Sequence, residues 1–198
     1  MEKRQIVLAS NNQGKVREIN ECLDGTAFRI VPQSEFNVPE IEETGLTFVE
    51  NALLKARNAA RYTGHPVIAD DSGIEVLALK GRPGIYSARY AGVNATDKDN
   101  LNKLIEEIKP LTEVDRKARF VCLMVYLRHA DDPTPVISQG IWDGIVIAEP
   151  HGPNGFGYDP MFYVPTHDCT SAELSPAIKN QLSHRGQALK ALIKEISA

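Results

Sequence analysis

Two adjacent carboxylates, Asp70 and Asp71, follow an apolar run in the stretch Val-Ile-Ala-Asp-Asp-Ser-Gly at residues 67–73. Like charges side by side repel each other, so an ionised pair calls for a nearby cation, and a divalent metal ion is the usual one. A turn that only needs Asp and Gly would require a single acid. Because neighbouring side chains of a strand point to opposite faces, only one of the pair need face a given pocket, and we favour Asp71, which precedes Ser72.

A second group of acids, Glu40, Glu42 and Glu43, lies earlier in the chain. Mg²⁺ is commonly bound by one or two protein carboxylates together with phosphate oxygens and water molecules. Glu43 and Asp71 could therefore form a sparse ligand set for this ion. The alternative is a solvated acidic loop, which we would prefer if the chain lacked the adjacent acid pair.

A polar turn between an apolar run and a helical pattern is formed by Ser10, Asn11, Asn12, Gln13, Gly14 and Lys15. Such a turn can direct backbone N–H groups and the helix dipole at an anion, and Lys15 adds a full positive charge. It is not a P-loop, because that motif needs Gly at the position of Ala9 and Ser or Thr at the position of Val16. Without that hydroxyl, Mg²⁺ must be held by carboxylates elsewhere. The simpler interpretation is a helix start with a solvated lysine.

A glycine-rich aromatic stretch, Gly-Phe-Gly-Tyr-Asp-Pro, occupies residues 155–160, and its candidate site residues are Phe156, Gly157, Tyr158 and Asp159. Glycines beside aromatics let the backbone approach a flat ligand while Phe156 stacks on it. Asp159 can accept hydrogen bonds from ring N–H groups. The alternative is a glycine-rich turn whose aromatic side chains fill the core.

The last candidate cluster comprises Lys179, His184 and Arg185. Ser183 is placed to cap the C-terminal helix, which is a structural role. His184 and Arg185 then lie in the first turn, where the helix dipole disfavours cations, and this placement suggests an anionic or carbonyl-bearing partner. For a lone His or Arg the structural interpretation would prevail, and it is the coincidence of several such clusters that favours a site.

The elements that would position these residues follow from apolar periodicity and capping signals. Strands are predicted at 5–9, 67–69, 73–79, 118–129 and 136–148, and helices at 15–23, 47–62, 96–109 and 187–196. In this prediction the strand at 67–69 ends at the acid pair. Helices alternate with strands early and paired strands dominate later, which predicts a mixed sheet flanked by helices.

Length and composition limit the class of protein and the partners that it can bind. The 198 residues, 42% hydrophobic and 24% charged, fit one globular domain, 1–198, with an ample core. The net charge of −4 with scattered basic residues argues against binding of nucleic acid or an anionic membrane. Three separated cysteines without CxxC spacing indicate neither disulfides nor zinc, and no signal peptide or membrane span is recognised, so we expect a cytoplasmic protein.

Taken together, these motifs resemble the Ham1/RdgB family of inosine triphosphate pyrophosphatases over essentially the full chain. The resemblance rests on Ser10-x-Asn12-x-x-Lys15, on residues 42–52, on Asp70-Asp71-Ser72-Gly73, on Pro83 to Arg89, on residues 155–160 and on residues 183–186. It implies an α/β, ITPase-like (Maf/Ham1) fold with an elongated mixed central sheet flanked by helices and two lobes around an active-site cleft. It also implies a homodimer that needs Mg²⁺ and hydrolyses ITP, dITP and XTP to the monophosphate and pyrophosphate, clearing deaminated purines.

The resemblance further implies roles for individual residues. The triphosphate would be bound by Ser10, Asn12, Lys15 and Lys179, and Mg²⁺ by Glu43 and Asp71. Asp71 would also activate the attacking water, and Ser72 would contact substrate. The base would be bound by Phe156, Tyr158, Asp159, His184 and Arg185. The segment from Pro83 to Arg89 has no mechanism that the sequence reveals.

Two other functions stay open at this stage. A P-loop-like GTPase switch would also use a lysine such as Lys15 but would release orthophosphate. A non-catalytic nucleotide sensor would bind ITP without turnover.

Overall fold

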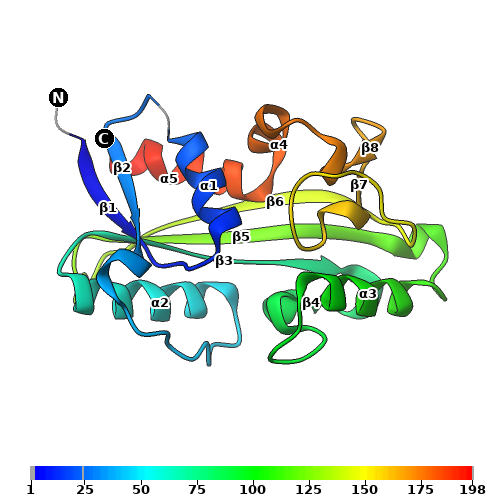
Figure 1. Cartoon of the computed structure of the whole chain (residues 1–198), viewed down its shortest axis with the longest axis horizontal. Helices are drawn as coiled ribbons and strands as arrows, with labels where there is room; N and C mark the ends of the chain where they lie inside the picture. Colours follow the sequence, from blue (N-terminus) through cyan, green and yellow to red (C-terminus); the bar gives the residue numbers. More distant parts are fainter. Residues whose placement is uncertain (1–2, 24, 198) are drawn as a thin grey trace. The chain divides into compact units, whose positions relative to one another are not determined.

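The computed structural model describes residues 3–23 and 25–197, which form two compact units (Figure 1). The described residues within 1–71, 122–140 and 185–198 make up unit 1, and residues 72–121 and 141–184 make up unit 2. No helix in the described part of the chain combines the length and the apolar character needed to cross a membrane.

The secondary structure is mixed α/β, as the sequence predicts. The helices are α1 (Gln13–Cys22), α2 (Phe48–Thr63), α3 (Asp97–Ile108), α4 (Pro176–Leu182) and α5 (His184–Ile196). The strands are β1 (Arg4–Leu8), β2 (Phe28–Pro32), β3 (Val67–Val76), β4 (Arg82–Pro83), β5 (Lys117–Leu127), β6 (Val136–Val146), β7 (Phe162–Val164) and β8 (Cys169–Thr170). Across the described residues they form an eight-stranded sheet in the order β2-β1-β3-β5-β6-β7-β8, and β4 pairs with β3. Parallel pairs join β1 to β2 and β3, whereas β7 is antiparallel to β6 and β8, so the sheet is mixed.

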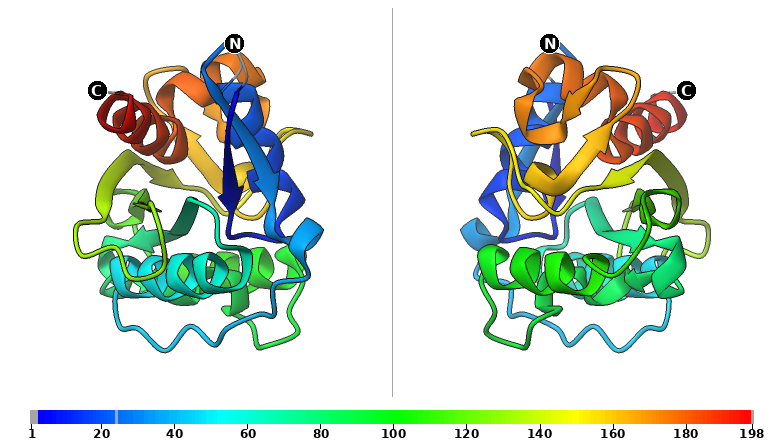
Figure 2. Two further views of the ribbon diagram at one scale, coloured as in Figure 1. Left: turned by 90° about the vertical axis from the view of Figure 1, so that its left-hand side faces the viewer. Right: turned by 90° about the vertical axis from the view of Figure 1, so that its right-hand side faces the viewer.

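In unit 1 the sheet has helices on both faces, α1 and α5 on one and α2 on the other (Figures 1 and 2). Ile6 and Leu8 of β1 belong to a buried cluster with residues of α1 and α5. Val7 and Ala9, which have the opposite parity, belong to a separate cluster with α2. The alternation of a pleated strand therefore sorts each side chain to one helical layer. The residues that α2 contributes to its cluster are small: Ala52, Ala56, Ala59 and Ala60.

Strand β3 corrects the prediction at the acid pair. The sequence predicts one strand that ends at Asp70 and another that begins at Gly73, but β3 runs without interruption from Val67 to Val76. The prediction was wrong because it treated Asp and Gly as turn formers, a local preference that tertiary partners can override. Asp70 and Asp71 stay within the strand because each faces a different helical layer with its own cationic partner, described below.

Helix α2 begins at the predicted N-cap, Thr47, but the Glu50 carboxylate bonds the backbone of the residue before the cap. The Thr47 hydroxyl accepts a hydrogen bond from the Glu50 N–H at 3.3 Å, and the Glu50 carboxylate accepts one from the Leu46 N–H at 2.9 Å. Gly64 ends the helix in the left-handed conformation, with φ of 67°. The end caps therefore fix where α2 lies along the sheet.

The longer elements with clear periodicity were predicted well, and the short ones were missed. The predicted strands at 118–129 and 136–148 correspond to β5 and β6, and the helix at 96–109 corresponds to α3. The C-terminal helix begins at His184, earlier than the predicted residue 187. The prediction lacked β2, β4, β7, β8 and α4, which are too short to show a sustained apolar period.

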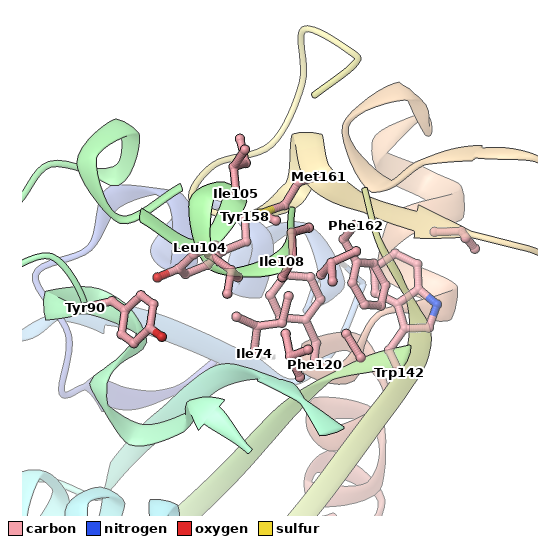
Figure 3. Packing of buried hydrophobic residues seen from close by; sticks show 14 of the residues in the cluster. Ile74, Tyr90, Leu104, Ile105, Ile108, Phe120, Trp142, Tyr158, Met161 and Phe162 are labelled. Atoms are coloured by element: carbon pink, nitrogen blue, oxygen red, sulfur yellow. The ribbon is translucent and has the colours of Figure 1, made fainter. Parts of the chain in front are cut away.

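Unit 2 has its own aromatic core (Figure 3). Phe120 of β5 and Trp142 of β6 both pack on Phe162 of β7, with ring centroids 4.6 and 5.1 Å from that ring. The side of α3 that carries Leu104 and Ile108 covers the same cluster. This core supports the loops on which the aromatic site residues lie.

Gly144 generates a prediction about this core. A Cβ atom at Gly144 would lie 2.5 Å from the Phe162 ring and 2.7 Å from the Tyr163 carbonyl oxygen. We expect Gly144→Ala to lower the free energy of unfolding by about 1–3 kcal/mol, because the added methyl overpacks the β6–β7 contact. The measurement is unfolding in guanidinium, followed by the fluorescence of Trp142, the one tryptophan of the sequence.

The control is Asp143→Ala at the exposed neighbouring position, which should change the unfolding free energy by no more than about 0.5 kcal/mol. Equal midpoints for Gly144→Ala and the wild type would contradict the close approach of β7 to Gly144.

Candidate active site

The turn between β1 and α1 is organised by its own side chains. Asn12 is the N-cap of α1, and its side-chain oxygen accepts a hydrogen bond from the Lys15 N–H at 3.1 Å. The Ser10 hydroxyl oxygen accepts one from the Asn12 N–H at 3.2 Å. Gln13 and Gly14 open the helix, where N–H groups have no acceptor within the helix. The turn therefore has the geometry of a helix N-terminus suited to an anion, as predicted.

Asn11 has a different role within the same turn. Its amide donates a hydrogen bond to the Glu40 carboxylate at 3.1 Å and accepts one from the Gln33 amide at 3.3 Å. The side chain of Asn11 thus ties the turn to the segment before α2.

Asp70 lies on the face of β3 that is covered by α1 and α5. Its carboxylate lies 2.8 Å from the Lys15 ammonium and 3.7 Å from Nε of Arg185, and its side chain has no exposed surface. Arg185 in turn donates a hydrogen bond to the Glu18 carboxylate. Burial alone would raise the pKa of Asp70, but Lys15 and Arg185 outweigh it and hold that pKa well below its usual range. Asp70 is therefore a firmly ionised group between two cations.

Asp71 lies on the opposite face of β3, against α2. One carboxylate oxygen lies 2.9 Å from the Lys55 ammonium, and the other accepts a hydrogen bond from the Asn51 amide at 3.4 Å. The same Lys55 ammonium lies 2.8 Å from the Glu43 carboxylate. Burial raises the pKa of Asp71, and the attraction of Lys55 only partly offsets this. The two neighbouring carboxyl groups thus have pKa shifts of opposite direction.

Three residues of these clusters escaped the sequence analysis: Glu18, Asn51 and Lys55. Asn51 and Lys55 are four positions apart in α2 and therefore share one face of the helix. That spacing, in a capped helix that directly precedes the acid pair, was a signal that could have identified them. Glu18 gave no comparable signal, because its partner Arg185 is 167 positions away.

The position of Lys55 shows whether Glu43 and Asp71 lie close enough together to bind one divalent cation. Within residues 3–23 and 25–197, no group of three or more His, Cys, Asp or Glu side chains could hold a metal ion. A single cationic group, the Lys55 ammonium, nevertheless contacts both carboxylates, so one point in space is within reach of both. Two carboxylate oxygens supplemented by water and phosphate oxygens suit Mg²⁺, and the donor set therefore fits this ion.

In unit 2, Asp159 organises the glycine-rich loop. One of its carboxylate oxygens accepts hydrogen bonds from the Phe156 N–H at 2.8 Å and from the Lys179 ammonium at 2.7 Å. The other accepts one from the Ser171 hydroxyl at 2.9 Å. Lys179 also lies over the Phe156 ring, 5.3 Å from its centroid. Phe156, Asp159 and Lys179, three of the predicted site residues, thus form one cluster.

The remaining predicted residues of unit 2 lie on the same body. The buried Tyr158 donates a hydrogen bond from its hydroxyl to the Ser87 carbonyl at 2.8 Å. The buried His184 ring stacks on Phe120, with centroids 4.7 Å apart and planes inclined by 9°. Ser72 is half-buried in β3. The contacts therefore gather the predicted residues into two groups, one within each unit, and Arg185 belongs to the group of unit 1.

Comparison with known proteins identifies relatives over nearly the whole chain. The model of the Ham1 family matches residues 6–195. The chain is 59% identical over 193 residues to the dITP/XTP pyrophosphatase of Vibrio cholerae, a match that covers 98% of this chain and 96% of the relative. It resembles the solved structure of a HAM1 protein from Coxiella burnetii, with 50% identity, a TM-score of 0.90 and 98% of each chain covered.

A second solved structure, the nucleoside-triphosphatase or dITP/XTP pyrophosphatase of Mycobacterium abscessus, has 37% identity and a TM-score of 0.75, with 96% of this chain and 98% of that chain covered. These likenesses confirm the expected mixed α/β, ITPase-like fold.

The opposite environments of Asp70 and Asp71 predict opposite tolerance to neutralisation. We expect Asp70→Asn to lower the free energy of unfolding by about 3–5 kcal/mol, because it removes the counter-ion that the half-buried Lys15 and the buried Arg185 share. Asp71→Asn should cost less, because burial already favours the neutral form of that carboxyl group. Urea unfolding followed by far-UV circular dichroism measures both variants.

A loss for Asp71→Asn as large as that for Asp70→Asn would contradict the assignment of Asp70 as the more strongly charge-stabilised group.

Proposed function

The chain belongs to the Ham1 family, and from this premise we propose that it hydrolyses the non-canonical purine nucleoside triphosphates ITP, dITP and XTP to the monophosphate and pyrophosphate. The observation that carries the proposal is the arrangement of Asp71, Glu43 and Lys55: two carboxylates that one cation reaches, at the strand next to an anion-binding turn. The names of the relatives supply the substrate class.

The triphosphate is bound in this proposal by the turn between β1 and α1. Lys15 supplies positive charge, and the first-turn N–H groups of α1 supply hydrogen-bond donors. The ammonium of Lys15 has several donors, so its contact with Asp70 is compatible with a second contact to a phosphate oxygen. Ser10 and Asn12 hold the turn in shape, and Lys179 contributes a further positive charge.

The chemical step is attack of water on the α-phosphorus. A bond forms between the water oxygen and phosphorus, the bond from phosphorus to the bridging oxygen breaks, and pyrophosphate leaves. Asp71 takes the proton that the water loses. Lys55 keeps Asp71 and Glu43 close together despite their like charges.

Glu43 and Asp71 are the residues that would hold Mg²⁺. When bound, this ion supplies positive charge that neutralises the phosphate oxygens and the departing pyrophosphate.

The base is recognised in this proposal by the residues that the sequence analysis selected: Ser72, Phe156, Gly157, Tyr158, Asp159, Lys179, His184 and Arg185. Phe156 stacks on the purine, and Arg185, which has only donors, bonds a 6-keto oxygen. A 6-amino group would leave a buried donor unpaired, at a cost of about 1–3 kcal/mol. Arg185 has several N–H groups, so its contacts with Glu18 and Asp70 are compatible with this role.

We also propose that the protein works in the cytoplasm as a homodimer and that the whole chain, 1–198, acts as one catalytic domain. The match of the family model to residues 6–195, which include parts of both units, supports a single functional domain.

Product analysis tests the reaction. With Mg²⁺ and no added inorganic pyrophosphatase, we expect pyrophosphate and monophosphate from ITP, dITP and XTP, and little product from GTP or ATP. Asp71→Asn should fold and bind XTP but lower kcat by about 10²–10⁴-fold, because it removes the base. Separation of the products by ion-exchange chromatography gives both answers.

Two outcomes would overturn the proposed reaction, and a third would overturn only the proposed base. Orthophosphate released preferentially from GTP would indicate a switch GTPase, and tight binding of ITP without any product would indicate a sensor. Near-normal kcat in Asp71→Asn would remove the proposed base while leaving the substrate class intact.

The role of Glu43 can be separated from that of its neighbour Glu42. We expect Glu43→Gln to raise the Mg²⁺ concentration needed for half-maximal activity by at least about tenfold, because one of the two carboxylate ligands is lost. Glu42→Gln, at an exposed position beside it, is the matched control and should leave the Mg²⁺ dependence unchanged. Equal Mg²⁺ titrations for the two variants would exclude Glu43 as a ligand.

A further inference from the structure

Successive residues of the glycine-rich loop are held by different parts of unit 2. The Phe156 N–H donates to Asp159 at 2.8 Å, as described above. The Gly157 N–H donates to a carboxylate oxygen of Asp97 at 3.0 Å, across a sequence separation of 60 residues. The Tyr158 hydroxyl donates to the Ser87 carbonyl. The loop is thus held by a hydrogen bond to one of its own residues and by hydrogen bonds to residues that are distant in the sequence.

Asp97 is the first residue of α3, yet the cap of this helix does not depend on it. Thr96 and Asp99 form the capping box, in which the Thr96 side chain accepts from the Asp99 N–H and the Asp99 carboxylate accepts from the Thr96 N–H. The Asp97 carboxylate is instead directed at Gly157. The Asp97 carboxylate therefore anchors the glycine-rich loop and takes no part in the capping box of α3.

The loop needs such an anchor because its backbone is unusual. Gly155 and Gly157 have φ angles of 79° and 59°, so the residues on both sides of Phe156 lie in the left-handed region. A Cβ atom at Gly155 would lie 2.2 Å from the Asp159 carboxylate. Glycines allow this turn but do not enforce it, since they populate many other conformations when unfolded. The direction of the Phe156 ring is set by the bonds that hold the peptide groups before and after it.

The helix that carries Asp97 is itself bonded to the segment before it. Asn100 of α3 is buried, and its amide accepts a hydrogen bond from the Ala91 N–H at 2.8 Å and donates one to the Ala88 carbonyl at 3.1 Å. The bond to Ala88 joins α3 to the 3-10 helix η3 (Gly84–Arg89). The Ser87 carbonyl of η3 accepts the hydrogen bond from the Tyr158 hydroxyl. The Ser87 hydroxyl oxygen also accepts from the Ile74 N–H of β3 at 3.0 Å.

The segment from Pro83 to Arg89, for which the sequence offered no mechanism, thus forms a block with the start of α3. Through Ser87 it contacts both the strand that carries Ser72 and the aromatic loop.

We propose that Asp97 is a positioning residue for purine recognition: its carboxylate fixes the Gly157 peptide and thereby orients the Phe156 ring for stacking. The inference rests on the proposed function, which assigns residues 156–159 to the base. It adds a residue of α3 that contacts no substrate and acts through Gly157. Asp97 also contributes, after burial and Tyr90, to raising the pKa of Tyr158, which agrees with its position beside the loop.

The alternative to the positioning role is that Asp97 only stabilises the helix that carries it. An acid in the first turn stabilises a helix through the dipole, and Asp99 in the same turn would do the same. Asp99 is therefore the matched control, because its loss weakens the start of α3 without removing the bond to Gly157.

The experiment measures kcat and KM for XTP in Asp97→Ala, Asp97→Asn, Asp99→Ala and Phe156→Ala. For Asp97→Ala we expect KM to rise about three- to tenfold with kcat within about twofold of the wild type, as for loss of one charge-assisted hydrogen bond. Asp97→Asn keeps a carbonyl oxygen as acceptor and should restore KM to within about twofold. Asp99→Ala should lower Tm but leave KM unchanged.

A second measurement reports on the loop without activity. Hydrogen exchange of the Gly157 amide should accelerate at least about tenfold in Asp97→Ala and stay unchanged in Asp99→Ala, because only the former removes its acceptor.

If Phe156→Ala raises KM, two results would overturn the positioning role of Asp97. One is an unchanged KM in Asp97→Ala, and the other is an equal rise in KM in Asp99→Ala. If Phe156→Ala leaves KM unchanged, the assignment of the loop to the base fails, and the positioning role fails with it. In that case the product assay still decides the reaction separately.

Discussion

The placement of two neighbouring carboxylates on opposite faces of β3 is the constraint on which the arrangement of the proposed catalytic residues depends. Adjacent charges in a turn would share one environment, whereas in a strand Asp70 and Asp71 point into different helical layers. Asp70 meets Lys15 of α1 and Arg185 of α5, and Asp71 meets Lys55 of α2. Each carboxylate thus has its own cation, and the alternation of side chains along the strand relieves the repulsion expected for adjacent acids.

This division separates two tasks that a single acid could not perform. The charge of Asp70 is fixed by the half-buried Lys15 and the buried Arg185, so it links α1 and α5 to the sheet and keeps the turn between β1 and α1 next to β3. Burial raises the pKa of Asp71, and the attraction of Lys55 only partly offsets this. A group that is permanently ionised is a poor proton acceptor, and the proposed base is the one of the pair whose charge is less strongly stabilised.

The sequence predicts most of the long elements and the N-cap of α2, because these depend on periodicity and local hydrogen bonding. It failed at β3, where a turn preference was outweighed by partners from three helices. It also failed to pair Glu18 with Arg185, since their contact depends on how distant segments pack. Lys55 is an intermediate case. Its spacing from Asn51 places the two residues on one face of α2, but only the folded structure shows that the Lys55 ammonium contacts both Glu43 and Asp71.

The loop at residues 155–160 follows the same principle, because the buried carboxylate of Asp159 again has its own cationic partner, Lys179. The sequence suggested Asp159 as an acceptor for ring N–H groups, and in the structure that carboxylate already accepts from Phe156, Lys179 and Ser171. A carboxylate has about four acceptor sites, so a purine donor would have to join a nearly complete set of partners. Asp159 can then contribute to recognition mainly by holding Phe156 and Lys179 in fixed positions. Selectivity for a base would arise from a preorganised surface, which loses little conformational freedom on binding, rather than from one free hydrogen-bonding group.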